Sequence, residues 1–198
     1  MITVSTSDGT KRGYHHGDLR KTAIGVGMRL LEDRDADDVG VRELARAVGV
    51  SAPALYRHFP DKDALREALA EEGLVRLAKA QMDAQSKAGP GIDGFNATGG
   101  AYVQFALANP GLFRLMFSSL PTLDALGGLD NKRDEAMQLL QRNAAQLVSE
   151  DVGPEAARLF ALRAWALVHG LAVLLLDKQI AGDKDLIEAV IDAKALIP

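Results

Sequence analysis

The sequence predicts an all-α protein of about nine helices. Apolar side chains recur at helical spacing through most of the 198 residues, and few stretches alternate apolar and polar side chains as strands do. Glycine and proline separate the periodic segments, at residues 89–94, at Pro110 and at residues 121–128. The composition, 47% hydrophobic and 25% charged, is that of an ordered globular chain with a core.

The first third of the chain predicts short helices behind a polar arm. Residues 1–17 contain no apolar run, so we expect a loosely held arm, and Asp18 is a candidate cap for a helix over Leu19–Glu32. An acidic loop over residues 34–39 then leads to a second helix, Val41–Val48, which places its apolar residues on one side.

A tight turn joins this second helix to a third. Gly49 stands where a helix ends in a left-handed residue, and Ser51 can cap a short helix that tolerates Pro53 in its first turn. We expect this helix to end near Phe59 and Pro60. Two short helices joined by a glycine turn are typical of the helix-turn-helix, whose second helix enters the DNA major groove. The same pattern also occurs in helical proteins that bind no DNA.

The rest of the chain predicts six more helices. The first follows an Asp61 cap and carries an expected apolar stripe of Leu65, Leu69, Leu77 and Met82. The expected ranges are Lys62–Lys87, Phe95–Asn109, Leu112–Ser118, Asn131–Val148, Pro154–Ile180 and, capped by Asp183, a last helix ending near Leu196. The most apolar run, Trp165–Leu176, is 12 residues long, whereas a membrane span needs about 20. It therefore predicts a buried helix and no membrane association.

Charge and cysteine content limit which ligands, metal sites and cellular location the sequence predicts. The net charge of −4 does not favour a nucleic-acid ligand, but residues 1–60 carry 9 basic against 8 acidic side chains and so leave room for a local basic face. The chain has no cysteine, which excludes a disulfide framework and a thiolate metal site. Together with the absence of an apolar leader in residues 1–17, this predicts a cytoplasmic protein.

The stretch Val41–Leu65, VRELARAVGVSAPALYRHFPDKDAL, resembles the DNA-binding signature of the TetR/AcrR family of bacterial regulators. The shared pattern is V-x-x-L-A-x-x-x-G-V-S, then L-Y-x-H-F, then K-x-x-L. This resemblance implies a DNA-binding domain over residues 1–61 and a helical ligand-binding and dimerisation domain over residues 62–198. It also implies a palindromic operator, a small-molecule effector of unknown identity, and a repressor that the effector releases.

The resemblance assigns roles to individual positions. Arg42 would reach a base or a phosphate, Tyr56 and His58 would bind phosphates, and Lys62 would take another at a helix N-terminus. For Tyr56 the alternative is simple packing. The full implied set is Arg42, Ser51, Ala52, Pro53, Ala54, Tyr56, Arg57, His58 and Lys62. Gly40 departs from the family, which has Ser or Thr there, so one hydroxyl–phosphate contact is absent.

A second resemblance lies late in the chain. Residues 109–117, NPGLFRLMF, and residues 165–170, WALVHG, are similar to the WHG subgroup of the family. Because Trp165 and His169 share one helix face, they are candidates to line an effector pocket, with ordinary core packing as the alternative for each. The candidate pocket residues are Tyr102, Phe105, Phe113, Met116, Phe117, Leu140, Trp165 and His169. The apolar helices within residues 154–198 are the expected homodimer surface.

Two other functional classes are alternatives to a DNA-binding regulator: a helical enzyme and a protein-interaction adaptor. A helical enzyme lacks support, because the chain contains no nucleophile elbow, glycine-rich phosphate loop or HExxH metal motif. We therefore expect no catalytic residue, no cofactor and no metal, and His15–His16 lacks a third ligand at suitable spacing. A protein-interaction adaptor with an unused helix-turn-helix stays open, and salt-dependent, sequence-specific DNA binding would exclude it.

Overall fold

The computed structural model describes residues 19–32, 39–119, 135–148 and 153–196, and within these ranges it contains helices and no strand. The predicted all-α fold is confirmed. The expected N-terminal arm, the Asp18 cap and most of the acidic loop lie outside the described residues, as does the predicted break over residues 121–128.

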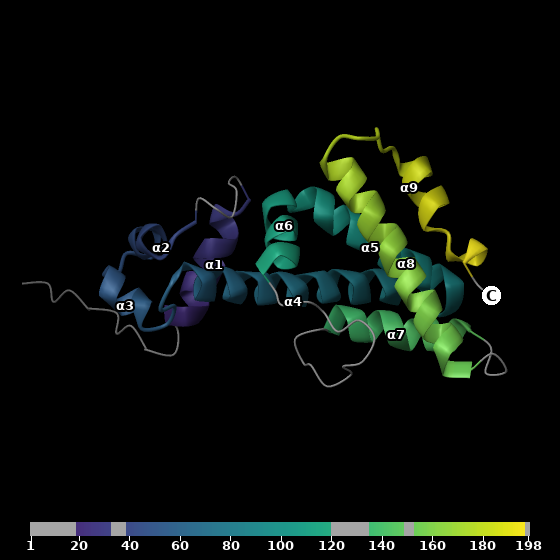
Figure 1. The fold of residues 1–198 in the computed structure, drawn as a ribbon, viewed down its shortest axis with the longest axis horizontal. Coiled ribbons are helices and arrows are strands. Elements are labelled where there is room, and N and C mark those ends of the chain that lie inside the picture. The colour runs from purple at the N-terminus through teal and green to yellow at the C-terminus, as the bar shows by residue number, and fades with distance from the viewer. Residues whose placement is uncertain (1–18, 33–38, 120–134, 149–152, 197–198) are drawn as a thin grey trace, which may run out of the picture.

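Three short helices form one end of the molecule (Figure 1). They are α1, Leu19–Leu30, α2, Val41–Val48, and α3, Ala52–Tyr56. Gly49 ends α2 with φ +81°, and its N–H donates to the carbonyl of Ala45 at 3.0 Å, as does the N–H of Val50. This left-handed turn was predicted, and it requires glycine because a side chain is strained at that φ.

Helix α4, Lys62–Ala88, runs from these three helices through the rest of the fold (Figure 1). The Asp61 carboxylate accepts the Ala64 N–H at 2.7 Å, so the predicted cap is confirmed. Leu65, Leu69 and Leu77 are fully buried, whereas Met82 is exposed, which corrects the predicted stripe. Gln81, one position earlier, takes the buried place instead.

Of the C-terminal helices, α5, α6 and α7 pack against α4, and α8 and α9 pack against α5. Their bounds are α5 Gly91–Ala108, α6 Pro110–Ser119, α7 Glu135–Leu147, α8 Gly153–Leu176, α9 Lys184–Ile191 and the 3₁₀ turn η3 Ala193–Ala195. Helix α5 starts four residues before the predicted Phe95. Gly94 permits this early start, since a Cβ there would lie 2.0 Å from the Gly89 carbonyl oxygen.

Two predicted helix ends were placed too late. Helix α8 ends at Leu176 and not at the predicted Ile180. Two residues beyond this end, Lys178 adopts φ +55° and donates its N–H to the Leu175 carbonyl. The last predicted helix is interrupted at Asp192, whose carboxylate accepts from Asn96 Nδ2 at 3.0 Å. The backbone N–H of Ala193 donates to Asn96 Oδ1 at 2.9 Å, so α5 holds the chain in the bend between α9 and η3.

One large core joins the N-terminal helices to α4, α5, α6 and α8, and a smaller one gathers around Phe95 and Phe160. Helix α8 is long and apolar enough to cross a membrane by composition, but it packs here against α5, α7 and α9. Only 33% of its most apolar window is buried within the chain. The single chain therefore leaves one apolar face of α8 exposed, within the residues 154–198 that are predicted to form the homodimer surface.

Candidate nucleic-acid interface and internal cavity

The surface of α2 and α3 carries most of the predicted DNA-binding residues. The side chains of Arg42, Ser51, Pro53, Tyr56, Arg57 and Lys62 are exposed. Ser51 accepts the Ala54 N–H through its hydroxyl at 3.4 Å, which caps the N-terminus of α3. Tyr56 is 38% exposed.

Two alanines of the predicted DNA-binding set are less exposed than its polar members. Ala52 and Ala54 are half-buried and pack against the core. Their partial burial follows from the spacing, since Ala52 and Ala54 flank the fully buried Leu55 on a short helix. His58 is half-buried as well, beyond the last residue of α3, which ends at Tyr56 and not near Phe59.

Phe59 fixes this surface to the rest of the domain. Its ring is almost completely buried, and the Arg20 guanidinium of α1 lies 5.5 Å from the ring centroid. A cation over an aromatic face is attracted to the ring quadrupole. The contact therefore holds the end of the helix-turn-helix against α1, and it was not evident from the sequence.

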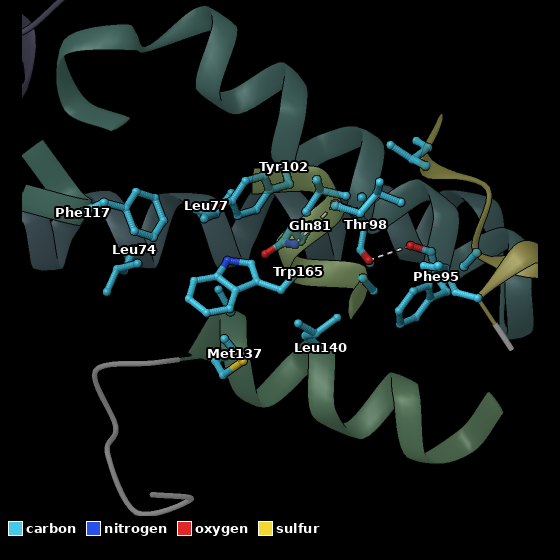
Figure 2. A pocket seen from close by; sticks show the side chains of 18 residues that line it. Leu74, Leu77, Gln81, Phe95, Thr98, Tyr102, Phe117, Met137, Leu140 and Trp165 are labelled. Carbon is cyan, nitrogen blue, oxygen red and sulfur yellow. Dashed lines mark hydrogen bonds between the residues drawn. The ribbon is translucent and has the colours of Figure 1, made fainter. Parts of the chain in front are cut away.

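An internal cavity lies between α4, α5, α7 and α8 (Figure 2). The cavity has a volume of about 50 Å³. Among the described residues its lining contains no Lys, Arg, His, Asp or Glu. The labelled lining residues in Figure 2 are Leu74, Leu77, Gln81, Phe95, Thr98, Tyr102, Phe117, Met137, Leu140 and Trp165. A lining that is mainly apolar with few polar groups is typical of sites for uncharged organic molecules.

Gln81 differs from the other polar residues that line the cavity in having a buried oxygen without a hydrogen-bond partner. Its side chain is 7% exposed, and its Nε2 donates to the Thr98 carbonyl at 3.3 Å. Its Oε1 is buried without a hydrogen-bond partner. Sequence reasoning missed Gln81, although its spacing from Leu74 and Leu77 placed it on the buried face of α4.

An aromatic cluster of Tyr102, Phe113, Phe117, Trp165 and His169 borders the cavity. The Tyr102 hydroxyl lies 2.9 Å from His169 Nδ1 and also takes a hydrogen bond from Trp165. Burial raises the pKa of the Tyr102 phenol, which therefore stays protonated and can donate to His169. Burial lowers the pKa of His169, which favours the neutral imidazole that accepts this proton.

The predicted pocket residues divide into two groups. Tyr102, Phe117, Leu140 and Trp165 line the cavity, whereas Phe105, Phe113, Met116 and His169 lie outside its lining. Met116 instead packs on α4, since a Cβ on Gly73 would lie 2.8 Å from its sulfur. Phe113 and His169 stack on each other, with ring centroids 5.6 Å apart, beside a separate surface depression.

Comparison with known proteins places both halves of the chain in one family. Residues 24–69 match the family described as bacterial regulatory proteins, tetR family. Residues 95–194 match the family described as tetracyclin repressor-like, C-terminal domain. The chain belongs to the TetR family. It is accordingly a transcriptional regulator and not an enzyme. The predicted family is confirmed, whereas the WHG subgroup stays a prediction.

Relatives of this TetR-family regulator support the assignment over nearly its full length. An uncharacterized HTH-type transcriptional regulator, YobS of Bacillus subtilis, is 24% identical over 177 residues, covering 88% of this chain and 87% of YobS. A solved protein of unknown function from Rhodococcus sp. RHA1 is 30% identical with a TM-score of 0.71, covering 94% and 97% of the two chains. A TetR variant from Acinetobacter baumannii, solved in complex with minocycline, is 21% identical with a TM-score of 0.59, covering 89% and 92%.

His169 gives this TetR-family regulator an expected pH dependence. Its pKa in the folded chain is lowered from the usual 6.5 by burial, so below that pH the unfolded chain binds the proton more readily. The stability contribution of neutral His169 is therefore complete above 6.5 and is lost as pH falls through the lowered folded pKa. We expect the free energy of unfolding to fall with pH in this window.

The measurement is urea unfolding over a pH series for the unmodified protein and for His169→Gln. Glutamine keeps an acceptor near Tyr102 but does not titrate, so its curve should lack the loss seen for histidine. His58→Gln is the matched control, because His58 lies on the helix-turn-helix away from the cluster. Parallel pH curves for the unmodified protein and His169→Gln would show that this histidine is not the cause.

Proposed function

We propose that this TetR-family regulator is a dimeric repressor, that it binds a palindromic operator through α2 and α3, and that a small molecule in the cavity releases it. One observation carries the proposal: α4 both follows directly from the helix-turn-helix and supplies Leu74, Leu77 and Gln81 to the cavity lining. A molecule that displaces the middle of α4 therefore acts on the helix that carries the DNA-binding end. Since it binds DNA, we also propose a cytoplasmic location.

The DNA contacts follow from exposure and residue type. Arg42 at the start of α2 and Tyr56 at the end of α3 are exposed on the helix-turn-helix and offer a guanidinium and a hydroxyl. Lys62 stands at the N-terminus of α4 and is suited to a phosphate, as is the end of that helix. With half-buried alanines at positions 52 and 54, few side chains can read base edges directly. Specificity would then depend on Arg42, Tyr56 and DNA shape.

The exposed face of α8 supports a homodimer. Leu159, Val173 and Leu174 on this face are 43%, 37% and 43% exposed, and Ala166 and Gly170 lie between them at helical spacing. A second copy related by a two-fold axis would cover this stripe, with small residues allowing close approach of the two helices. Such a dimer could place its recognition helices about 34 Å apart, one turn of DNA.

Tight packing along α4 gives the release a physical route. A Cβ on Gly27 would lie 2.8 Å from Leu69, so α1 rests directly on α4. Further along, Gly73 receives Met116 and Leu112 of α6 just as closely. Packed elements of this kind shift together, and an effector that binds one arrangement better moves the population toward it. The TetR variant bound to minocycline supports the view that this fold holds an organic molecule.

Selection of binding sites from a random DNA pool, followed by fluorescence anisotropy over a salt series, tests this function. We expect one enriched palindrome bound by two chains, with an affinity that falls steeply as salt rises because counterions are released from the phosphates. A pool that yields no enriched sequence, with only weak and uniform binding, would favour the protein-interaction adaptor.

A further inference from the structure

We propose that the effector is an uncharged, mainly apolar molecule with one hydrogen-bond donor, and that this donor binds Gln81 Oε1 in the cavity. This inference rests on the proposed function, since it names the chemical class of the molecule that the cavity would take. Its basis is that, among the described residues that line the cavity, the polar side chains have hydrogen-bond partners except for Gln81 Oε1.

The orientation of the Gln81 amide is fixed by its neighbour. Nε2 faces the Thr98 carbonyl at 3.3 Å, and a flipped amide would set two acceptor oxygens against each other there. Oε1 is therefore the atom left over, and it is buried without a partner. Leaving a buried acceptor unpaired costs about 1–3 kcal/mol. A ligand that donates a hydrogen bond to Oε1 would remove this unfavourable free energy, so Gln81 is suited to bind such a donor.

The other polar groups nearby are already engaged. The Thr98 hydroxyl donates to the Phe95 carbonyl at 2.7 Å, and the Tyr102 hydroxyl is held between His169 and Trp165. Figure 2 shows Gln81, Thr98, Tyr102 and Trp165 projecting toward the same space from α4, α5 and α8. A bound water needs two to four polar partners, and this lining offers it one free acceptor. An organic molecule with an apolar body and a single donor matches the surroundings better.

The charge of the ligand follows from the same lining. Burying a carboxylate without a cation is unfavourable, and the described lining residues include no Lys, Arg or His. An anionic oxygen would also face the Gln81 oxygen. An ammonium group would satisfy Oε1 but would be buried without a carboxylate partner among the described residues. The flat faces of Phe95, Phe117 and Trp165 favour an aromatic or alicyclic body.

Isothermal titration calorimetry with four para-substituted toluenes of similar size tests this assignment on the full chain. Para-cresol is neutral with a donor, para-methylanisole is neutral without one, para-toluate is an anion, and para-methylbenzylamine is a cation. We expect para-cresol to bind at least about tenfold more tightly than para-methylanisole, since the hydrogen bond relieves an unpaired buried acceptor. Equal binding of these two probes, or tightest binding of either charged probe, would overturn the proposal.

Two variants test whether the preference for para-cresol depends on Gln81. Gln81→Met has a similar shape without the acceptor and should bring the affinities of para-cresol and para-methylanisole together. Gln85→Met is the matched control, because Gln85 lies one turn further on α4, pairs with Asn143 at 3.0 Å and lies outside the cavity lining. It should keep the tenfold ratio. A Gln81→Met protein that folds and keeps the ratio would overturn the role of Gln81, and the ratio in the unmodified protein tests the ligand class without any variant.

A failure of this inference can be distinguished from a failure of the proposed function. A protein that shows the tenfold preference without binding any operator would support the cavity chemistry and overturn the proposed function as an operator-binding repressor. A protein that binds its operator while the four probes fail to show the preference would remove the effector class alone.

Discussion

Replacing Arg42 and Tyr56 together by alanine is expected to abolish specific DNA binding while leaving the fold intact. Both side chains are exposed on the helix-turn-helix, so neither loss opens a cavity in the core. A side chain that contacts a base contributes about 1–3 kcal/mol, and two such losses in each chain reduce the affinity on the order of 10³-fold or more. Losing a cationic contact to phosphate should also make the binding less sensitive to salt.

Fluorescence anisotropy against the selected operator measures this loss, and circular dichroism verifies the fold. The matched control is Lys79→Ala/Arg142→Ala, which also removes two exposed side chains, but from α4 and α7 at the other end of the molecule. Its affinity should match that of the unmodified protein. If both double variants bind the operator equally well, the interface has been assigned to the wrong surface.

Replacing Gly170 by arginine is expected to separate the two chains of the proposed dimer. Gly170 lies on the exposed face of α8, and a Cβ built there meets no atom within 4 Å, so the single chain accommodates a side chain. Across a two-fold axis the same change would place two like charges in an apolar contact, where neither is solvated or paired. A single chain loses the gain from bivalent binding, so operator affinity should fall on the order of 10²-fold or more.

Analytical ultracentrifugation gives the mass of Gly170→Arg, and anisotropy gives its operator affinity. Gln104→Arg is the control, since Gln104 is an exposed residue of α5 that does not lie on the α8 stripe. It should stay dimeric with unchanged affinity. A dimeric Gly170→Arg protein would mean that the chains associate through another surface.

Local chemistry explains why the N-terminal helices could be predicted closely. Gly49, Ser51 and Asp61 each act within a few residues of their own position, as a left-handed turn or as caps, and the structure places all three as expected. Such features depend on nearest neighbours in the chain, so a sequence specifies them directly. The helix ends at Leu176 and Asp192 depend in part on distant residues such as Asn96, and these were misplaced.

The lining of the cavity, in contrast to the N-terminal helices, could be predicted from the sequence only in part. Helical spacing correctly placed Trp165 and His169 on one face of α8, but only Trp165 reaches the cavity lining. The turn between Ala108 and Pro110 sets α6 against α4, where Met116 fills the notch at Gly73 and Phe113 covers His169. No periodicity contains that information, because it depends on which two surfaces meet.

Residue type at short spacing was enough to predict the helical fold, the glycine turn and caps of the helix-turn-helix, and the protein's family. Three-dimensional packing was needed to place Gln81 at an internal cavity with an unpaired oxygen, and to show which side of the most apolar helix is exposed. Whether a polar atom has a hydrogen-bond partner, or an apolar face is covered, depends on neighbours that are far away along the chain.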